Sequence, residues 1–400
     1  MRIGIVHWGF PPIIGGVETH LVVTGPEMVK MGHEVFLLTG AAEGSPENFE
    51  FEGMKVIRKK VMDLNWLFKS QFGEVDSNLE DVFDEFLKIA RPDIFHAHNM
   101  HYFCQYHARN LERIAKENNI PLVLTAHNCW TDKTYVDLTT KIGWDHIISI
   151  SEYITREITA VGFPKEKIST LWHGVDEKLF TPGEPHPSIF EKFPALKTDR
   201  PIVFCPARSG LSKGCDIAVE ALRLIKEEIP DVLLVMAGSK NIIDWGLTQN
   251  KDLAFIVNLV HQLKLEDNFY IDCYNINEMP ELYRLADVVI YPSSVEEPFG
   301  LVMLESMATA KPIVVTDSGG MPEIIFNDVN GFVVKKRHYE ALAERCIKLL
   351  KDKALSKRLG ETGRKLVEEK YTKRIITQKM LNVYEQMLQK NKAPRQAALV

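Results

Sequence analysis

The stretch that decides the fold class is VVIYPSSVEEPFGLVMLESMATAKPIVVT, residues 288–316. Two short apolar runs, residues 288–291 and 313–316, flank a segment of helical period at residues 300–309. Continuous short apolar runs are typical of strands that are buried on both faces, as in a parallel sheet covered by helices. A strand, a helix and a second strand in this order therefore predict one βαβ unit of an α/β protein.

The same alternation extends along the chain in both directions. Further strands are predicted at residues 2–6, 35–39, 94–98, 122–125, 147–150, 202–205 and 233–237, and further helices at residues 16–31 and 215–228. The series restarts at Pro201, after a segment rich in proline that shows no sustained period. We therefore predict two doubly wound domains with parallel sheets. Their expected bounds are residues 1–180 and 201–371, with a linker at 181–200 and a C-terminal helix and tail at 372–400 that packs back on the N-terminal domain.

Composition excludes several classes of protein. Hydrophobic residues make up 45% and charged residues 26% of the 400 residues, which are ordinary globular values. A net charge of −6 argues against a protein that coats nucleic acid. The six cysteines form no Cys-x-x-Cys pair, which argues against a disulfide framework or zinc site and favours a reducing cytoplasm. Residues 1–6 are interpreted as a strand rather than a signal peptide, so we expect a cytoplasmic protein with at most peripheral membrane contact.

Two loops that follow strands contain adjacent glycines. The loop WGFPPIIGGVET, residues 8–19, opens a helix at Gly15 and Gly16, where backbone N–H groups favour an anion. A tight turn without a ligand explains this loop equally well. For the loop TDSGGMPE, residues 316–323, a structural turn is the better interpretation.

A third loop, PARSGLSKG at residues 206–214, carries two cations, Arg208 and Lys213. An arginine presents a planar fork to phosphate oxygens and a lysine presents a point charge. The alternative is a pair of solvated surface cations.

A fourth loop, residues 292–305, leaves a strand and enters a helix. The start of that helix leaves N–H groups unpaired, which suits phosphate, at Gly300, Leu301 and Val302. Glu297 precedes the helix and Glu305 lies about two turns along it, so both carboxylates are candidates for sugar hydroxyls. The alternative is that the two glutamates only complement the helix dipole.

Taken together, these motifs resemble the retaining GT-B glycosyltransferases of the GT4 type (glycosyl transferases group 1), over essentially the whole chain. The resemblance is carried by PSSVEEPFGLVMLESMATAKPIVVTDSGGMPEII with its two glutamates eight positions apart, and by PARSGLSKG, IIGGVETH, MGHEVFLLT, HAHN and WHGVDEKLF. It implies the GT-B fold, in which two Rossmann-like domains face each other across a cleft.

The resemblance also implies roles for individual residues. Arg208 and Lys213 would hold the donor diphosphate, Glu305 the ribose, and Glu297 and His98 the donor sugar. The implied donor-binding set is Gly15, Gly16, Arg208, Lys213, Glu297, Phe299, Gly300, Leu301, Val302 and Glu305, and the implied catalytic set is Glu297, His98, Arg208 and Lys213. The chain departs from the family pattern at His173, where many members have Asn, and at residues 209–212.

Other candidates lie in the predicted N-terminal domain. His96, His98 and His101 invite a metal site, but no carboxylate or cysteine accompanies them at ligand spacing, so we expect no metal. For His98 a buried structural role is the alternative to sugar contact. Weaker candidates for the acceptor side, with core packing as the equal alternative, are His127, Tyr102 and Trp130.

The segment KVIRKKVMDLNWLFK, residues 55–69, is basic and carries aromatic residues around Trp66. We interpret it as a strand at residues 55–61 followed by a partly buried loop. A rim of the acceptor site and contact with an anionic membrane are the alternatives.

The implied reaction transfers a hexose-type sugar from a nucleotide-diphosphate sugar, UDP- rather than GDP-, to the hydroxyl of a sugar, small-molecule or lipid-linked acceptor. Configuration would be retained, with no cofactor and no metal, and the leaving phosphate would help accept the acceptor proton. The alternatives are a GT-B epimerase or phosphorylase, and a non-catalytic protein that binds sugar nucleotides. A dehydrogenase is disfavoured because the dinucleotide fingerprint is missing.

Overall fold

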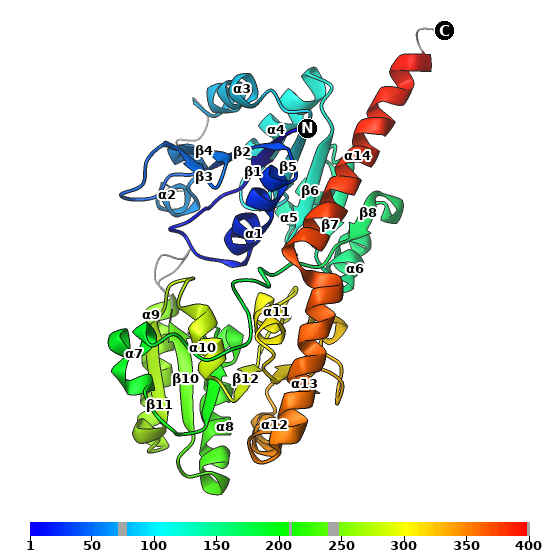
Figure 1. Cartoon of the computed structure of the whole chain (residues 1–400). Helices are drawn as coiled ribbons and strands as arrows, with labels where there is room; N and C mark the ends of the chain where they lie inside the picture. Colours follow the sequence, from blue (N-terminus) through cyan, green and yellow to red (C-terminus); the bar gives the residue numbers. More distant parts are fainter. Residues whose placement is uncertain (71–77, 208–209, 239–247, 398–400) are drawn as a thin grey trace. The chain divides into compact units, whose positions relative to one another are not determined.

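The computed structural model describes residues 1–70, 78–207, 210–238 and 248–397, which form two compact units (Figure 1). Of the described residues, 1–70, 78–174 and 373–397 belong to the first unit and 175–207, 210–238 and 248–372 to the second. The first unit therefore gives way to the second after Gly174, before the expected boundary at Phe180. Each unit is described by itself.

The first unit is built on an eight-stranded sheet, counted over the described residues. Its strands are β1 (Arg2–Val6), β2 (Glu34–Gly40), β3 (Asn48–Phe51), β4 (Met54–Lys59), β5 (Ile94–His98), β6 (Leu122–Ala126), β7 (His146–Ser149) and β8 (Ile168–Thr170), in the order β3-β4-β2-β1-β5-β6-β7-β8. All neighbours pair in parallel except β3 with β4. The chain runs outward from β1 to β2 and then returns to the other side of β1 at β5, so the strand order reverses between β1 and β5.

Helices cover both faces of this sheet. They are α1 (Gly16–Lys30), α2 (Leu64–Lys69), α3 (Leu79–Ala90), α4 (Gln105–Glu117), α5 (Lys133–Thr140), α6 (Glu152–Ala160) and the C-terminal α14 (Lys373–Ala397). Apolar side chains of α14 enter the same core cluster as strands β1, β2 and β5 and helix α1: Ile376, Met380, Leu381, Val383, Tyr384 and Met387. The last helix of the chain thus completes the core of the first unit (Figure 1, red).

The second unit contains a six-stranded, all-parallel sheet in the described residues. Its strands are β9 (Ile202–Cys205), β10 (Leu233–Gly238), β11 (Phe269–Cys273), β12 (Val288–Tyr291), β13 (Ile313–Thr316) and β14 (Phe332–Val334), in the order β11-β10-β9-β12-β13-β14. Its helices are α7 (Ser188–Lys192), α8 (Cys215–Glu228), α9 (Thr248–Gln262), α10 (Met279–Leu285), α11 (Leu301–Ala308), α12 (Tyr339–Lys351) and α13 (Lys353–Leu366). Here the strand order reverses between β9 and β12.

The predicted class, two doubly wound units with parallel sheets, is confirmed. The segment expected as a linker, residues 181–200, contains the short helix α7. One local expectation was wrong. Strand β4 ends at Lys59, and the aromatic residues after it lie on helix α2 rather than in a loop, with Leu67 buried and the Lys60 ammonium 4.9 Å from the Trp66 ring.

None of the helices in the described ranges carries an apolar stretch long enough to cross a membrane.

The packing of α14 predicts that Leu381→Ala destabilises the first unit. Leu381 is 1% exposed, and truncating a buried leucine to alanine typically costs about 2–5 kcal/mol through lost burial and the cavity left behind. Amide hydrogen exchange in β1 should accelerate accordingly. Gln386→Ala, an exposed position on the same helix, is the control and should leave exchange unchanged. Equal protection of β1 in Leu381→Ala and the parent protein would contradict the packing of α14 into this core.

Candidate functional site

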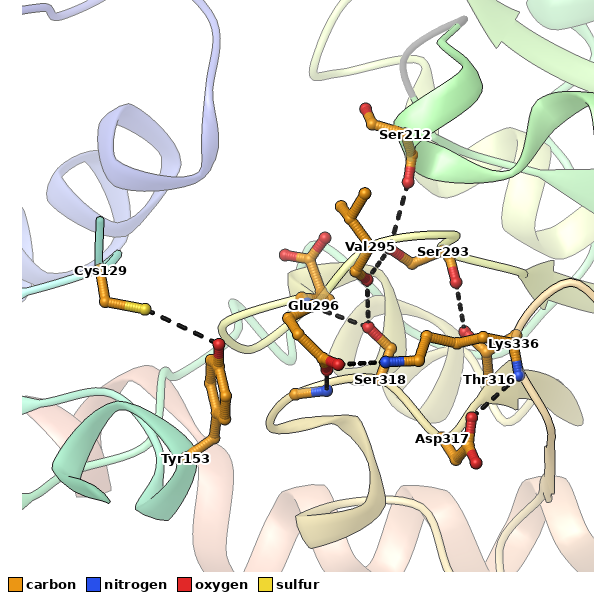
Figure 2. Close-up of polar contacts among 12 residues, drawn as sticks. Cys129, Tyr153, Ser212, Ser293, Val295, Glu296, Thr316, Asp317, Ser318 and Lys336 are labelled. Carbon is orange, nitrogen blue, oxygen red and sulfur yellow. Dashed lines mark hydrogen bonds and ion pairs between the residues drawn. The ribbon is translucent and has the colours of Figure 1, made fainter. Parts of the chain in front are cut away.

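In the second unit, two loops lie side by side at the point where the strand order reverses. In open parallel sheets this point, at the carboxyl ends of the strands, is where ligands bind. The main-chain oxygen of Ser212, in the loop after β9, accepts a hydrogen bond from Ser293 Oγ, in the loop after β12, at 3.3 Å (Figure 2). The same oxygen accepts from Ser294 N at 3.0 Å. A Cβ on Gly214 would lie 1.8 Å from the oxygen of Pro292, so the two loops pack backbone against backbone.

This packing brings Lys213 and Glu297 together. The Lys213 ammonium lies 2.6 Å from Glu297 Oε2, and Tyr291 Oη donates a hydrogen bond to the same oxygen at 2.6 Å. The side chains of Lys213 and Glu297 are only 22% and 11% exposed. Two donors therefore fix the orientation of one carboxylate next to one cation. Arg208, the other predicted cation, lies outside the described residues.

The Gly-Gly turn after β13 forms hydrogen bonds with the backbone of Glu297. Gly320 N donates to the main-chain oxygen of Glu297 at 2.9 Å, and Glu297 N donates to Ser318 Oγ at 2.8 Å. Gly319 has φ +50°, and a Cβ there would lie 2.1 Å from the Glu297 oxygen. Glu296 accepts from Gly319 N at 2.6 Å and from Lys336. The turn at residues 316–323 thus holds the glutamate loop in place.

The start of α11 offers unpaired backbone donors beside this ion pair. Gly300 caps the helix with φ +90°, and among the described residues no hydrogen bond reaches the N–H groups of Leu301 and Val302. N–H groups at a helix start favour an anion. Phe299 is buried, so its side chain belongs to the core of the unit.

Glu305 lies further along α11 and is held by a residue that the sequence analysis did not select. Tyr283 Oη, on α10, donates to Glu305 Oε2 at 2.6 Å. Burial raises the pKa of Glu305 to about 7, and the hydrogen bond from Tyr283 acts in the opposite direction. This carboxylate titrates close to neutral pH.

In the first unit, the loop after β1 carries a second pair that sequence reasoning missed. His7 Nδ1 lies 3.2 Å from the main-chain oxygen of His98, and His7 Nε2 lies 3.0 Å from Glu18 Oε1. The His7 ring therefore bridges the backbone at the end of β5 and a carboxylate on α1. A Cβ on Gly15 would lie 2.3 Å from Glu18 Oε2, so this glycine makes room for the carboxylate. An acidic residue three positions after a glycine at a helix start was the available signal.

The predicted residues His98 and His127 come together in the first unit. His98 Nδ1 and His127 Nε2 are 2.8 Å apart, and their rings stack at a centroid distance of 5.1 Å. His98 Nε2 and His127 Nδ1 are buried and have no hydrogen-bond partner among the described residues. His173, the residue that departs from the family pattern, stacks on His127 at 5.1 Å and contacts His20 Nδ1 through its own Nδ1 at 3.0 Å.

The other two histidines of the predicted cluster are occupied by structural contacts. His96 Nε2 lies 2.6 Å from Thr125 Oγ1, and its Nδ1 lies 2.5 Å from Tyr384 Oη of α14. His101 Nε2 donates to the main-chain oxygen of Asn128 at 3.1 Å. These contacts give His96 and His101 roles in packing.

Two of the acceptor-side candidates form an aromatic platform. The rings of Tyr102 and Trp130 stack in parallel, with centroids 4.0 Å apart and an interplanar angle of 11°. Tyr102 Oη donates to Asp132 Oδ2 at 2.6 Å, and burial together with this contact raises the pKa of Tyr102 to about 12. Both rings are partly exposed, as a surface for an apolar sugar face requires.

Comparison with known proteins gives the class and then the family. The model for glycosyl transferases group 1 matches residues 188–366, and the model for glycosyltransferase family 4 matches residues 14–179. The chain is therefore a GT-B glycosyltransferase. It belongs to the GT4-type family of glycosyl transferases group 1, as its motifs predicted.

Individual relatives span nearly the whole chain. An uncharacterized glycosyltransferase of Methanocaldococcus jannaschii is 26% identical over 96% of this chain and 98% of its own length. A glycosyltransferase of Rickettsia africae has a TM-score of 0.80 at 22% identity, over 97% of this chain and 99% of that one. Anabaena HepE, solved in complex with UDP and glucose, has a TM-score of 0.77 at 18% identity, over 96% and 99%.

The buried histidines of the first unit predict that stability falls in mild acid. Burial, with neighbouring histidines, lowers the pKa of His20 and His96 to about 3 from an ordinary value of 6.5. Between these values the unfolded chain binds protons that the folded protein rejects, so the free energy of unfolding decreases as pH falls below 6.5. Each group contributes a slope of at most about 1.4 kcal/mol per pH unit.

Melting temperatures measured across this range check the expectation. His20→Gln should lose less melting temperature per pH unit below pH 6.5, because one of the histidines whose pKa is lowered by folding is gone. His186→Gln removes an exposed histidine whose ring contacts Ser188, and it is the control, with an unchanged slope. The assignment would be wrong if the parent and His20→Gln proteins lost stability with the same pH dependence.

Proposed function

We propose that this glycosyltransferase transfers a hexose-type sugar, with retention of configuration and without a metal, from a UDP-sugar to an acceptor hydroxyl. The observation that carries the proposal is the Lys213–Glu297 pair beside the unpaired N–H groups of α11, at the point where the strand order of the second unit reverses. A cation, helix-start donors and an oriented carboxylate suit a diphosphate with an attached sugar. The complex of Anabaena HepE with UDP and glucose supports the choice of donor.

In this proposal the second unit binds the donor. Lys213, Arg208 and the N–H groups of Leu301 and Val302 take the diphosphate, and Glu297 accepts hydrogen bonds from sugar hydroxyls. Glu305 accepts from the ribose.

The first unit supplies the acceptor side. His98 donates to or accepts from a sugar hydroxyl through Nε2, whose partner nitrogen is held by His127. The Tyr102–Trp130 platform stacks on an apolar sugar face.

The reaction breaks the bond between the anomeric carbon and the diphosphate oxygen and forms a bond to the acceptor oxygen on the same face. The acceptor proton passes to the leaving diphosphate oxygen. Charge that develops on that oxygen is stabilised by preorganised donors, which is commonly the largest contribution to such catalysis. Glu297 is already engaged by Lys213 and Tyr291, so its proposed role is orientation of the sugar rather than nucleophilic attack.

The identity of donor and product is tested directly. Nucleotide-sugars are screened by their effect on the melting temperature, and the product of the best donor is examined by NMR. A UDP-sugar should stabilise most, and the new anomeric centre should keep the donor's configuration. Inversion, or stabilisation by GDP-sugars only, would contradict the corresponding part of the proposal.

Lys213→Ala should lower kcat by about 10²–10³-fold, because one donor to the developing charge is lost. Release of UDP in the presence of acceptor measures the effect, and an unchanged melting temperature shows that the fold is intact. Lys226→Ala, on the exposed face of α8, is the matched control and should retain full activity. Arg208→Ala is expected to behave as Lys213→Ala does. Near-normal turnover of both site variants would refute the diphosphate assignment.

Activity should survive treatment with EDTA, because a cation and helix-start N–H groups provide the positive charge that a metal would otherwise supply. Turnover is measured before and after chelation and after addition of Mg²⁺ or Mn²⁺. A loss that either ion restores would show that the reaction requires a metal.

A further inference from the structure

The buried hydroxyl of Tyr283 donates a hydrogen bond to the carboxylate of Glu305 in the second unit. Tyr283 has one O–H group, and that group donates to Glu305 Oε2 at 2.6 Å. The distance is that of a charge-assisted hydrogen bond, which is shorter and stronger than one between neutral groups. Burial raises the pKa of Tyr283 well above its usual value, so the hydroxyl remains a donor.

The tyrosine ring is held rigidly. Tyr283 is fully buried, and its ring meets Phe204 of β9 edge to face at 5.2 Å and Phe180 at 5.7 Å. Aromatic side chains packed in this way have few alternative rotamers. The hydroxyl is therefore aimed at Glu305 by the core of the unit.

The remaining acceptor positions of Glu305 are available to a ligand. An ionised carboxylate has about four lone-pair positions, and Tyr283 occupies one of them. Among the described residues, no other group donates a hydrogen bond to the Glu305 carboxylate, and the residue is partly exposed.

We propose that Tyr283 is the positioning residue for recognition of the donor ribose: its hydroxyl orients Glu305 and favours the carboxylate form, which accepts hydrogen bonds from the ribose hydroxyls. This inference rests on the proposed function, in which Glu305 binds the ribose. It adds a residue that does not itself touch the ligand.

The electrostatics of the pair agree with this role. Burial raises the pKa of Glu305 to about 7, and Tyr283 is the one group that lowers it among those with a resolved effect. Other groups facing the pair act on Tyr283 instead: Tyr291 of β12 and Cys205 of β9 both raise its pKa. Without the Tyr283 hydroxyl, the pKa of Glu305 rises further, and at neutral pH more of the carboxyl is protonated.

Charged residues on the neighbouring helices are paired elsewhere. Arg364 of α13 donates to the main-chain oxygen of Ala308 at 2.7 Å and contacts Glu368 at 2.7 Å. On α10, Arg284 and Glu281 pair at 2.6 Å. The ionisation of Glu305 therefore depends on Tyr283 and burial.

Tyr283→Phe tests the proposal because it keeps the ring and removes only the donor. Binding of UDP and of 2′,3′-dideoxy-UDP is measured by calorimetry near pH 7 and near pH 9. Near pH 7 the variant should bind UDP about tenfold more weakly than the parent protein, the effect of losing one hydrogen bond of about 1.4 kcal/mol. Near pH 9 the carboxylate is ionised again and most of the difference should disappear.

Two further variants isolate the hydroxyl. Tyr274→Phe makes the same change at a buried tyrosine of the same unit whose hydroxyl has no hydrogen-bond partner in the described residues, and it should bind as the parent does. In Glu305→Gln, which cannot ionise, adding Tyr283→Phe should produce no pH-dependent loss.

Each remaining outcome has one meaning. Tyr283→Phe binding UDP as tightly as the parent at both pH values would overturn the inference. An equal loss at both would also overturn it, because a packing defect does not depend on the ionisation of Glu305. Equal affinity of the unmodified protein for UDP and its dideoxy analogue would instead overturn the proposed ribose contact, which is measured without any Tyr283 variant.

Discussion

Parallel pairing of β9 with β12 is the constraint on which the rest of the second unit depends. It sets Val203 opposite Val288 and Phe204 opposite Val289, so both strands end at the same edge of the sheet. The loops that follow must then pack against each other, and Gly214 at their closest point allows backbone to meet backbone. The ion pair, the exposed helix start and the glutamate of α11 all follow from that one adjacency.

Buried polar groups need partners, and the two units provide these partners differently. In the first unit, a group of histidines bond and stack on one another and remain uncharged, since burial makes protonation costly. In the second, each glutamate of the site has a dedicated donor: Lys213 and Tyr291 for Glu297, and Tyr283 for Glu305. Both arrangements fix the direction of the side chains.

Much of the fold and part of the site could be predicted from the sequence. Buried parallel strands are continuous apolar runs, so β5, β9, β12 and β13 were predicted with the bounds they have. Lys213 and Glu297 were selected because charged residues beside glycines follow those strands. Tyr283, His7 and Glu18 were not selected, because their importance lies in contacts between segments distant in sequence or folded back under a turn. A tyrosine within an amphipathic helix gives no local sign that its hydroxyl meets a glutamate 22 residues away.

The C-terminal helix α14 determines when the core of the first unit can be completed during synthesis. The described residues of the second unit lie between 175 and 372, whereas the first unit combines described residues up to 174 with α14. During synthesis, the apolar side chains of α14 leave the ribosome only after the whole sequence of the second unit has emerged. The N-terminal unit is thus the first to be translated and the last to obtain its full core, and until then the surface that α14 covers stays open to chaperones, proteases and other nascent chains.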